Sequence, residues 1–157
     1  MSKKDFLQEI KTDSDSMTLT SILNWIDNNK VSIESQLEEC GAILFSNLPV
    51  EEEGDFDNFV SAFKYETFTY EESLSNAVRI NKTNKVFTAN EAPKEIEIFL
   101  HHEMAQTPTY PKNIFFFCKS ASLEGGQTPL CRSDHLYEAI LKEDEDLIDE
   151  FEKHGVI

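Results

Sequence analysis

Residues 101–130 read HHEMAQTPTYPKNIFFFCKSASLEGGQTPL, and this segment is the most informative part of the 157-residue chain. In an extended backbone, side chains alternate between two faces, so His101 and Glu103 point to one side and His102 to the other. A histidine and a carboxylate at this spacing can hold one metal ion from a single strand end. They would be two of the three ligands of a two-histidine, one-carboxylate Fe(II) site. The spacing alone is weak, because most His–Glu pairs belong to surface or salt-bridge chemistry.

The residues that follow the pair have the composition of strands and turns. Ile114 to Cys118 is the strongest predicted strand, and Cys118 is expected in the core because it lies within this apolar run. Glu124-Gly125-Gly126 predicts a turn, and residues 128–131 a short returning strand. Beyond them the pattern predicts two helices, one capped by Ser133 and one beginning near Glu143. Their apolar residues are expected on buried faces: Leu136, Ile140, Leu141, Leu147, Ile148 and Phe151.

The region before the segment is predicted to begin with helices. Residues 1–40 show apolar stripes at helical spacing, first at Phe6, Leu7 and Ile10 and then from residue 19 to residue 26. A third helix is expected to begin at Ser32, with Gly41 as the stop. Residues 42–45 predict a short buried strand, and the phenylalanines of residues 56–63 a further helix.

Composition excludes several classes of function. Fourteen basic and 30 acidic residues give a formal net charge of −16, which argues against binding to nucleic acid or to an anionic membrane surface. The three cysteines include no CxxC pair, and the first residues carry no apolar signal-peptide core. A reducing cytoplasm is the expected location.

These motifs are more informative together, in this order, than any one of them alone. The pair within residues 101–104, the Tyr110-Pro111 step, the strand 114–118 and the segment 124–130 together resemble the taurine dioxygenase / clavaminate synthase-like (TauD/TfdA-like) family of Fe(II)/2-oxoglutarate-dependent oxygenases. Residues 41–45 and 56–60 also look like that family's N-terminal region, so the resemblance covers most of the chain from about residue 37 onward. Its closest branch acts on amino-acid-like groups.

The resemblance implies a role for four residues. His101 and Glu103 would be Fe(II) ligands, and Thr128 would hydrogen-bond a carboxylate of the cosubstrate 2-oxoglutarate. Met104 would line the substrate pocket, although a core gap-filler is an equal alternative for a methionine. The implied reaction consumes O₂ and 2-oxoglutarate and usually hydroxylates a small organic substrate.

The chain differs from the family pattern in the residues that would complete the metal and cosubstrate site. The family's distal iron-binding histidine and its 2-oxoglutarate-binding arginine lie far towards the C-terminus. His135 and His154 fall in predicted helices and match neither, and Arg132 is too near Thr128 in sequence to replace the arginine. The expected architecture is therefore α+β: a single, partial oxygenase domain over residues 1–157, with helices over 1–40. Residues 41–157 would form the first part of a double-stranded β-helix, or jelly roll.

Three explanations of the partial motif stay open. The chain could be a fragment or the product of a split gene, a degenerate remnant without activity, or a non-catalytic interaction module that keeps the first half of the fold. Its partners would be a small-molecule substrate and either a C-terminal half or a second copy of the chain. Substrate identity, the third metal ligand and oligomeric state do not follow from the sequence.

Overall fold

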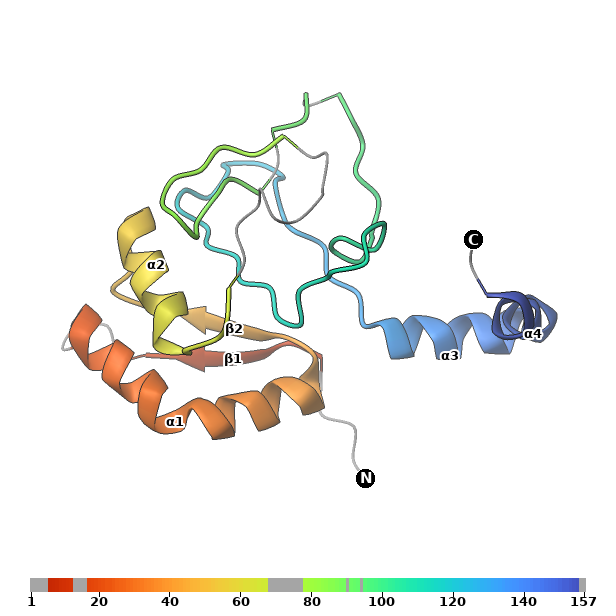
Figure 1. Ribbon diagram of the computed structural model, residues 1–157, viewed down its shortest axis with the longest axis horizontal. Helices are drawn as coiled ribbons and strands as arrows, with labels where there is room; N and C mark the ends of the chain where they lie inside the picture. The colour runs from red at the N-terminus through yellow and green to blue at the C-terminus, as the bar shows by residue number, and fades with distance from the viewer. Residues whose placement is uncertain (1–5, 13–16, 68–77, 90, 94, 156–157) are drawn as a thin grey trace. The chain divides into compact units, whose positions relative to one another are not determined.

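The computed structural model describes residues 6–12, 17–67, 78–89, 91–93 and 95–155 (Figure 1). The chain divides into two compact units, Met1–Gly126 and Gln127–Ile157, and each is described here by itself. The first unit carries β1, α1, β2 and α2, and the second carries α3 and α4. The prediction of a single partial domain stays a prediction.

The first unit is built on a strand–helix–strand arrangement. Strands β1 (Gln8–Lys11) and β2 (Ile43–Ser46) pair in parallel, with Gln8 opposite Ile43 and Lys11 opposite Ser46. Parallel neighbours need a long crossover between them, and helix α1 (Leu19–Cys40) supplies it (Figure 1). The expected helix over residues 6–10 is therefore wrong. Phe6 and Leu7 precede β1, and Ile10 lies in this strand, whose partner is far along the chain.

Helix α1 has clear sequence signals at both ends. Thr18 and Ser21 form a capping box in which each side chain bonds the other's backbone N–H, at 2.9 and 3.2 Å. At the other end Gly41 adopts a left-handed φ of 85°, which glycine tolerates without steric cost, and its N–H donates to the Leu37 carbonyl. Gly41 is confirmed as the stop. A separate helix beginning at Ser32 is not formed, because that residue lies inside α1.

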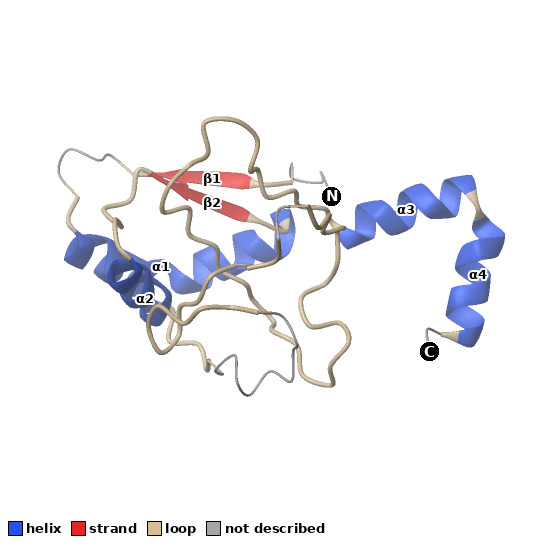
Figure 2. Ribbon diagram, turned by 90° about the horizontal axis from the view of Figure 1, so that it is seen from above, coloured by secondary structure: helices blue, strands red, loops and turns tan. Residues whose placement is uncertain are grey.

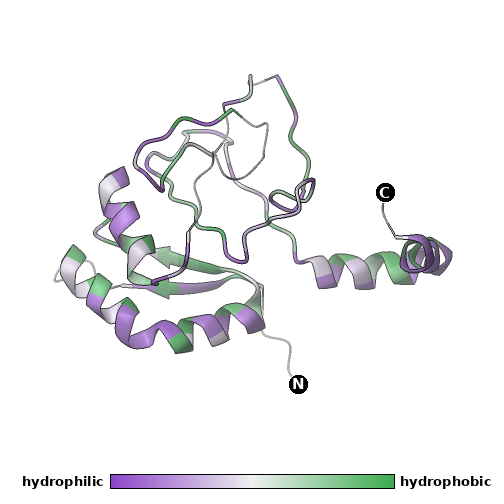
Figure 3. Cartoon of the chain, in the orientation of Figure 1, coloured by the Kyte–Doolittle hydropathy of each residue, from purple (hydrophilic) through white to green (hydrophobic). Residues whose placement is uncertain are grey.

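The core of the first unit lies between α1, α2 (Glu53–Ala62) and the two strands. Five residues form its buried centre: Ile22, Ile26, Ile33, Phe59 and Phe63. Ile10, Ile43 and Phe45 of the strands pack against this cluster. Hydrophobic and hydrophilic positions alternate along α1, as an amphipathic helix requires (Figure 3).

The described parts of the chain between α2 and α3 are drawn as loop (Figure 2). Within it, residues 114–118 alternate between exposed and half-buried positions, as an extended segment does. They pair with no strand among the described residues, and neither do residues 128–131. Cys118 is exposed, so its assignment to the core is wrong: the alternation places Phe115 and Phe117 inward instead. The sheet of the described residues has two strands, and a jelly roll is not seen in it.

The second unit contains the two helices that the periodicity predicted. Helix α3 spans Ser133–Glu143 and α4 spans Glu145–His154; Ser133 is the first helical residue of α3, and Arg132 takes the N-cap position. Ile148 is buried in this unit. The other apolar positions expected on a buried face are largely open, with Leu136, Leu141, Leu147 and Phe151 exposed. In the described parts of the chain, no helix is both long and apolar enough to cross a bilayer.

Candidate metal centre

A hairpin-like loop over residues 79–89 contacts one of the two predicted metal ligands, Glu103. Asn81 and Phe87 form an antiparallel bridge. The arms are joined further by the Thr88 N–H, which donates to the Ile80 carbonyl at 3.0 Å, and by the Ile80 N–H, which donates to Thr88 Oγ1 at 3.0 Å. The backbone that follows Arg79 is thereby fixed.

Side chains connect this loop to α2. Thr83 Oγ1 donates to Asp57 Oδ2 at 2.5 Å, and Lys85 Nζ donates to Ser61 Oγ at 2.9 Å. Ser61 in turn donates to the second Asp57 oxygen at 3.2 Å. Val86 of the same loop is buried. The loop is therefore attached to the part of the unit that contains the core.

From this loop, Arg79 reaches the predicted ligand Glu103. Nη2 of Arg79 donates to Oε1 of Glu103 at 2.8 Å, while Nη1 donates to the Ala89 carbonyl at 2.5 Å. The two side chains are 12% and 25% exposed, so this ion pair is shielded from water much more than an ordinary surface pair. The guanidinium also lies over the ring of Phe87, 5.4 Å from its centroid.

The orientation of His101 suits metal binding. Its Nδ1 lies 2.7 Å from the Phe99 carbonyl oxygen. A carbonyl can only accept a hydrogen bond, so Nδ1 is the donor, and in the neutral ring this leaves the lone pair on Nε2. Metal-binding histidines are commonly held in this way. The donor set of a neutral imidazole nitrogen and a carboxylate oxygen therefore fits Fe(II).

Met104, directly after Glu103, has an unusual backbone. Its φ is 60°, in the left-handed region that non-glycine residues seldom adopt, and its side chain is 5% exposed. The turn is closed by the Ala105 N–H to the His102 carbonyl and by the Thr107 N–H to the Met104 carbonyl, at 3.2 and 3.0 Å. Glu103 therefore lies in a tight turn rather than in a strand. The role of Met104 in a substrate pocket stays a prediction.

The remaining predicted residues belong to the second unit. Thr128 is exposed, and its contact with 2-oxoglutarate stays a prediction. Arg132 binds Asp134 through two hydrogen bonds of 2.8 Å, which lower the pKa of that carboxyl to about 2. His154 lies 3.4 Å from Glu150. Within the ranges that the structure describes, no three His, Cys, Asp or Glu side chains gather as a metal site would require.

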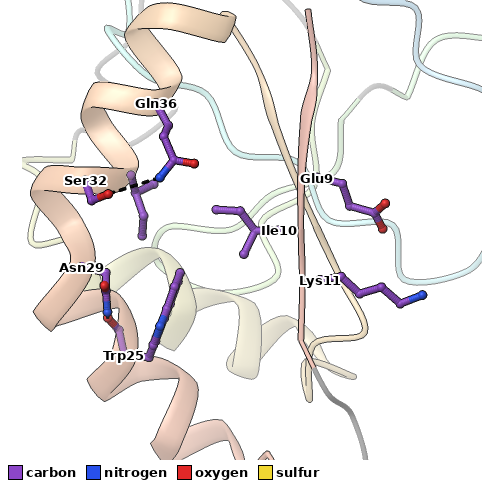
Figure 4. A pocket seen from close by; sticks show the side chains of 8 residues that line it. Glu9, Ile10, Lys11, Trp25, Asn29, Ser32 and Gln36 are labelled. Carbon is purple, nitrogen blue, oxygen red and sulfur yellow. Dashed lines mark hydrogen bonds between the residues drawn. The ribbon is translucent and has the colours of Figure 1, made fainter. Parts of the chain in front are cut away.

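A hollow of the first unit lies elsewhere. It is bordered by β1 and α1, and Figure 4 shows Trp25, Asn29, Ser32 and Gln36 along the helix, facing Ile10 of the strand. Ser32 and Gln36 are joined by a hydrogen bond of 3.2 Å. None of the predicted site residues lines this hollow, so it adds nothing to the metal centre.

Comparison with known proteins identifies the family of the chain. The model of the taurine catabolism dioxygenase TauD, TfdA family matches residues 4–155. The chain belongs to this family. A clavaminate synthase-like protein of Arabidopsis thaliana is 34% identical over 141 residues, which cover 90% of this chain and 42% of that protein. The dapdiamide synthesis protein DdaC of Enterobacter agglomerans is 32% identical over 124 residues, covering 79% of this chain and 36% of that protein. The chain thus spans less than half the length of these relatives.

Membership of the TauD/TfdA family confirms the resemblance read from residues 101–130. By its description, this family is one of dioxygenases. No motif in the sequence marks Arg79 as part of the site. The available signal was its position as the one arginine between residues 1 and 131 in a strongly acidic chain.

Proposed function

We propose that this chain contributes His101 and Glu103 to the Fe(II) site of a 2-oxoglutarate-dependent dioxygenase that acts on an amino-acid-like or other small organic substrate. The observation that carries the proposal is the His101 ring, whose Nδ1 is occupied by the Phe99 carbonyl so that Nε2 remains for a metal. Family membership supports it. The complete fold would be the jelly roll, with this chain as its first part.

Each proposed site residue has one task. His101 Nε2 and a Glu103 oxygen would hold the iron, and Thr128 would hydrogen-bond a carboxylate of 2-oxoglutarate. Met104 would form part of the apolar wall that orients the substrate. The bound iron would supply the oxidative decarboxylation of 2-oxoglutarate to succinate, with O₂ as oxidant, that accompanies substrate hydroxylation. A third protein ligand and a cation for the dianionic cosubstrate are still required.

Metal titration tests the proposal directly. Mn(II), which prefers the same oxygen and nitrogen ligands, is added to the purified chain, and binding is followed by calorimetry or by the electron paramagnetic resonance signal of free Mn(II). We expect weak one-site binding, which both His101→Ala and Glu103→Ala abolish. His154→Ala is the matched control and should bind as the unaltered chain does. Binding that survives the loss of His101 and of Glu103 would place the metal elsewhere.

The alternative function is a non-catalytic interaction module. It is favoured by one observation: Ile96, Ile98, Phe99 and Leu100, just before the predicted ligands, are between 48% and 74% exposed. Exposed apolar runs of this kind mark surfaces that bind another polypeptide. Sedimentation of the chain with a separately produced C-terminal half of a family member tests this. A complex that forms equally well with the His101→Ala chain, together with no metal binding, would favour the alternative.

A further inference from the structure

Arg79 and Glu103 come from separate segments, and their contact is specific. The guanidinium bonds the loop and the carboxylate at once: it donates to the backbone carbonyls of Thr88 and Ala89, at 3.4 and 2.5 Å, and to Glu103 at 2.8 Å. A planar arginine fork can do this because its donors point in fixed, diverging directions, which a lysine cannot reproduce. The hairpin-like loop therefore holds the guanidinium in place independently of its bond to the carboxylate.

The contact engages one carboxylate oxygen. Arg79 donates to Oε1 of Glu103, and no bond to Oε2 is formed from the described residues. In a two-histidine, one-carboxylate site the metal needs one oxygen from the carboxylate, and the open positions are kept for cosubstrate and O₂. A cation fixed on Oε1 directs the metal to Oε2 and opposes two-oxygen coordination.

The backbone of Glu103 is also restrained. The turn after it contains Met104 at a φ of 60° and two backbone hydrogen bonds. Backbone strain of this kind persists only where the surroundings hold it, and it gathers at functional sites. The position of the carboxylate is thus restrained twice, by the turn that carries Glu103 and by the guanidinium that binds it.

We propose that Arg79 is a positioning residue of the metal centre: it holds Glu103 through Oε1 so that Oε2 is presented to the metal as a single-oxygen ligand. This inference rests on the proposed role of Glu103 as a ligand. The inference adds a residue outside the His101–Glu103 motif. The loop that carries Arg79 is attached to α2 by the side chains of Thr83 and Lys85.

The experiment compares Mn(II) affinity in purified chains carrying Arg79→Gln or Arg79→Lys. Both changes destroy the two-way fork, and the lysine variant keeps the charge. Partners that orient metal ligands commonly account for a tenfold to hundredfold range of affinity, so we expect each variant to bind Mn(II) about tenfold more weakly or worse. With Co(II) as the probe, the visible absorption bands should also change shape, because the coordination by Glu103 changes.

Arg132→Gln is the matched control, since it breaks an arginine–carboxylate pair of the same 2.8 Å length that involves no proposed ligand. Circular dichroism of every variant shows whether it is folded. Unchanged or tighter Mn(II) binding by a folded Arg79→Gln chain would overturn the inference, because Arg79 would then only compete with the metal. Full affinity in Arg79→Lys would also overturn it, because charge alone would suffice.

Glu103→Gln separates this inference from the proposed function. If that variant binds Mn(II) like the unaltered chain, Glu103 is no ligand and the proposed function fails first. If Glu103→Gln loses the metal while the Arg79 variants keep it, the metal centre stands and only the positioning role of Arg79 fails.

Discussion

The rings of Phe63 and Phe115 pack against each other with their centroids 5.2 Å apart and their planes inclined by 54°. Phe63 directly follows α2, belongs to the buried cluster of the core and is 2% exposed. Phe115 belongs to the extended segment 114–118, so this contact attaches that segment to the core.

The neighbouring phenylalanines give a matched pair of substitutions. Phe115→Ala should lower the free energy of unfolding by about 2 kcal/mol, below the range for a fully buried ring because this one is half-buried. Phe116 is 59% exposed, and Phe116→Ala should change the free energy by less than about 0.5 kcal/mol. Urea unfolding followed by the fluorescence of Trp25, the single tryptophan, measures both. Equal losses would show that segment 114–118 does not lie as described.

Two glycines should respond to alanine in opposite directions. Gly41→Ala should destabilise the protein by about 1 kcal/mol, because alanine resists the left-handed φ of 85°. Gly54→Ala, within α2, should stabilise it by about 0.5 kcal/mol, since an added Cβ meets nothing within 4 Å and glycine costs entropy in a helix. Thermal unfolding of both variants checks the pair. A gain from Gly41→Ala would contradict the helix end described for α1.

Ionisation of Tyr65 makes the stability of the folded protein depend on pH in the alkaline range. Burial, and then a hydrogen bond with Glu34, raise the pKa of Tyr65 from 10.0 to about 12. The folded chain therefore keeps the phenol proton where the unfolded chain has lost it. This contribution to stability is complete below pH 10 and is lost as the pH rises through about 12.

Phenolate absorbance measures this titration. A Tyr137→Phe background is used, because a hydrogen bond from Tyr137 to Glu152 also raises the pKa of that tyrosine. Tyr65→Phe should remove the last step of the titration, and Glu34→Gln should move it to lower pH while leaving the ring half-buried. If Glu34→Gln leaves the step in place, the hydrogen bond makes no contribution.

Residues 1–157 alone should not release succinate from 2-oxoglutarate. The cosubstrate is a dianion, the net charge of −16 opposes it, and the described residues bring no third metal ligand to His101 and Glu103. Succinate is measured with Fe(II) and O₂, with and without a supplied C-terminal half of a family member. Metal-dependent release by the chain alone, abolished by His101→Ala, would overturn this expectation.

Local signals predicted much of the secondary structure. Apolar periodicity gave α2 and the two closing helices, and the short run at residues 42–45 gave β2. The same reasoning failed at Phe6, Leu7 and Ile10, because a strand there depends on a partner beyond α1 that helical spacing does not reveal. It also failed for Cys118, because half of the side chains in an extended segment face away from the core.

The proposed metal centre was predictable only in part. The spacing of His101 and Glu103 and the family resemblance predict the pair from sequence, because both residues lie in one short motif. The contact between Arg79 and Glu103 joins two segments whose approach is decided by tertiary packing. No local rule brings them together, so only the folded chain could show it.

The parallel pairing of β1 with β2 also has a consequence for biosynthesis. During translation β1 leaves the ribosome first, yet its partner follows only after the whole of α1. Helix α1 can form from its own capping box while β1 still has an open edge. We therefore expect nascent chains that end before residue 43 to be helical and prone to aggregate through the unpaired β1. Chains that end after residue 63 should resist protease. Protection of β1 in the shorter chains would show that it finds another partner first.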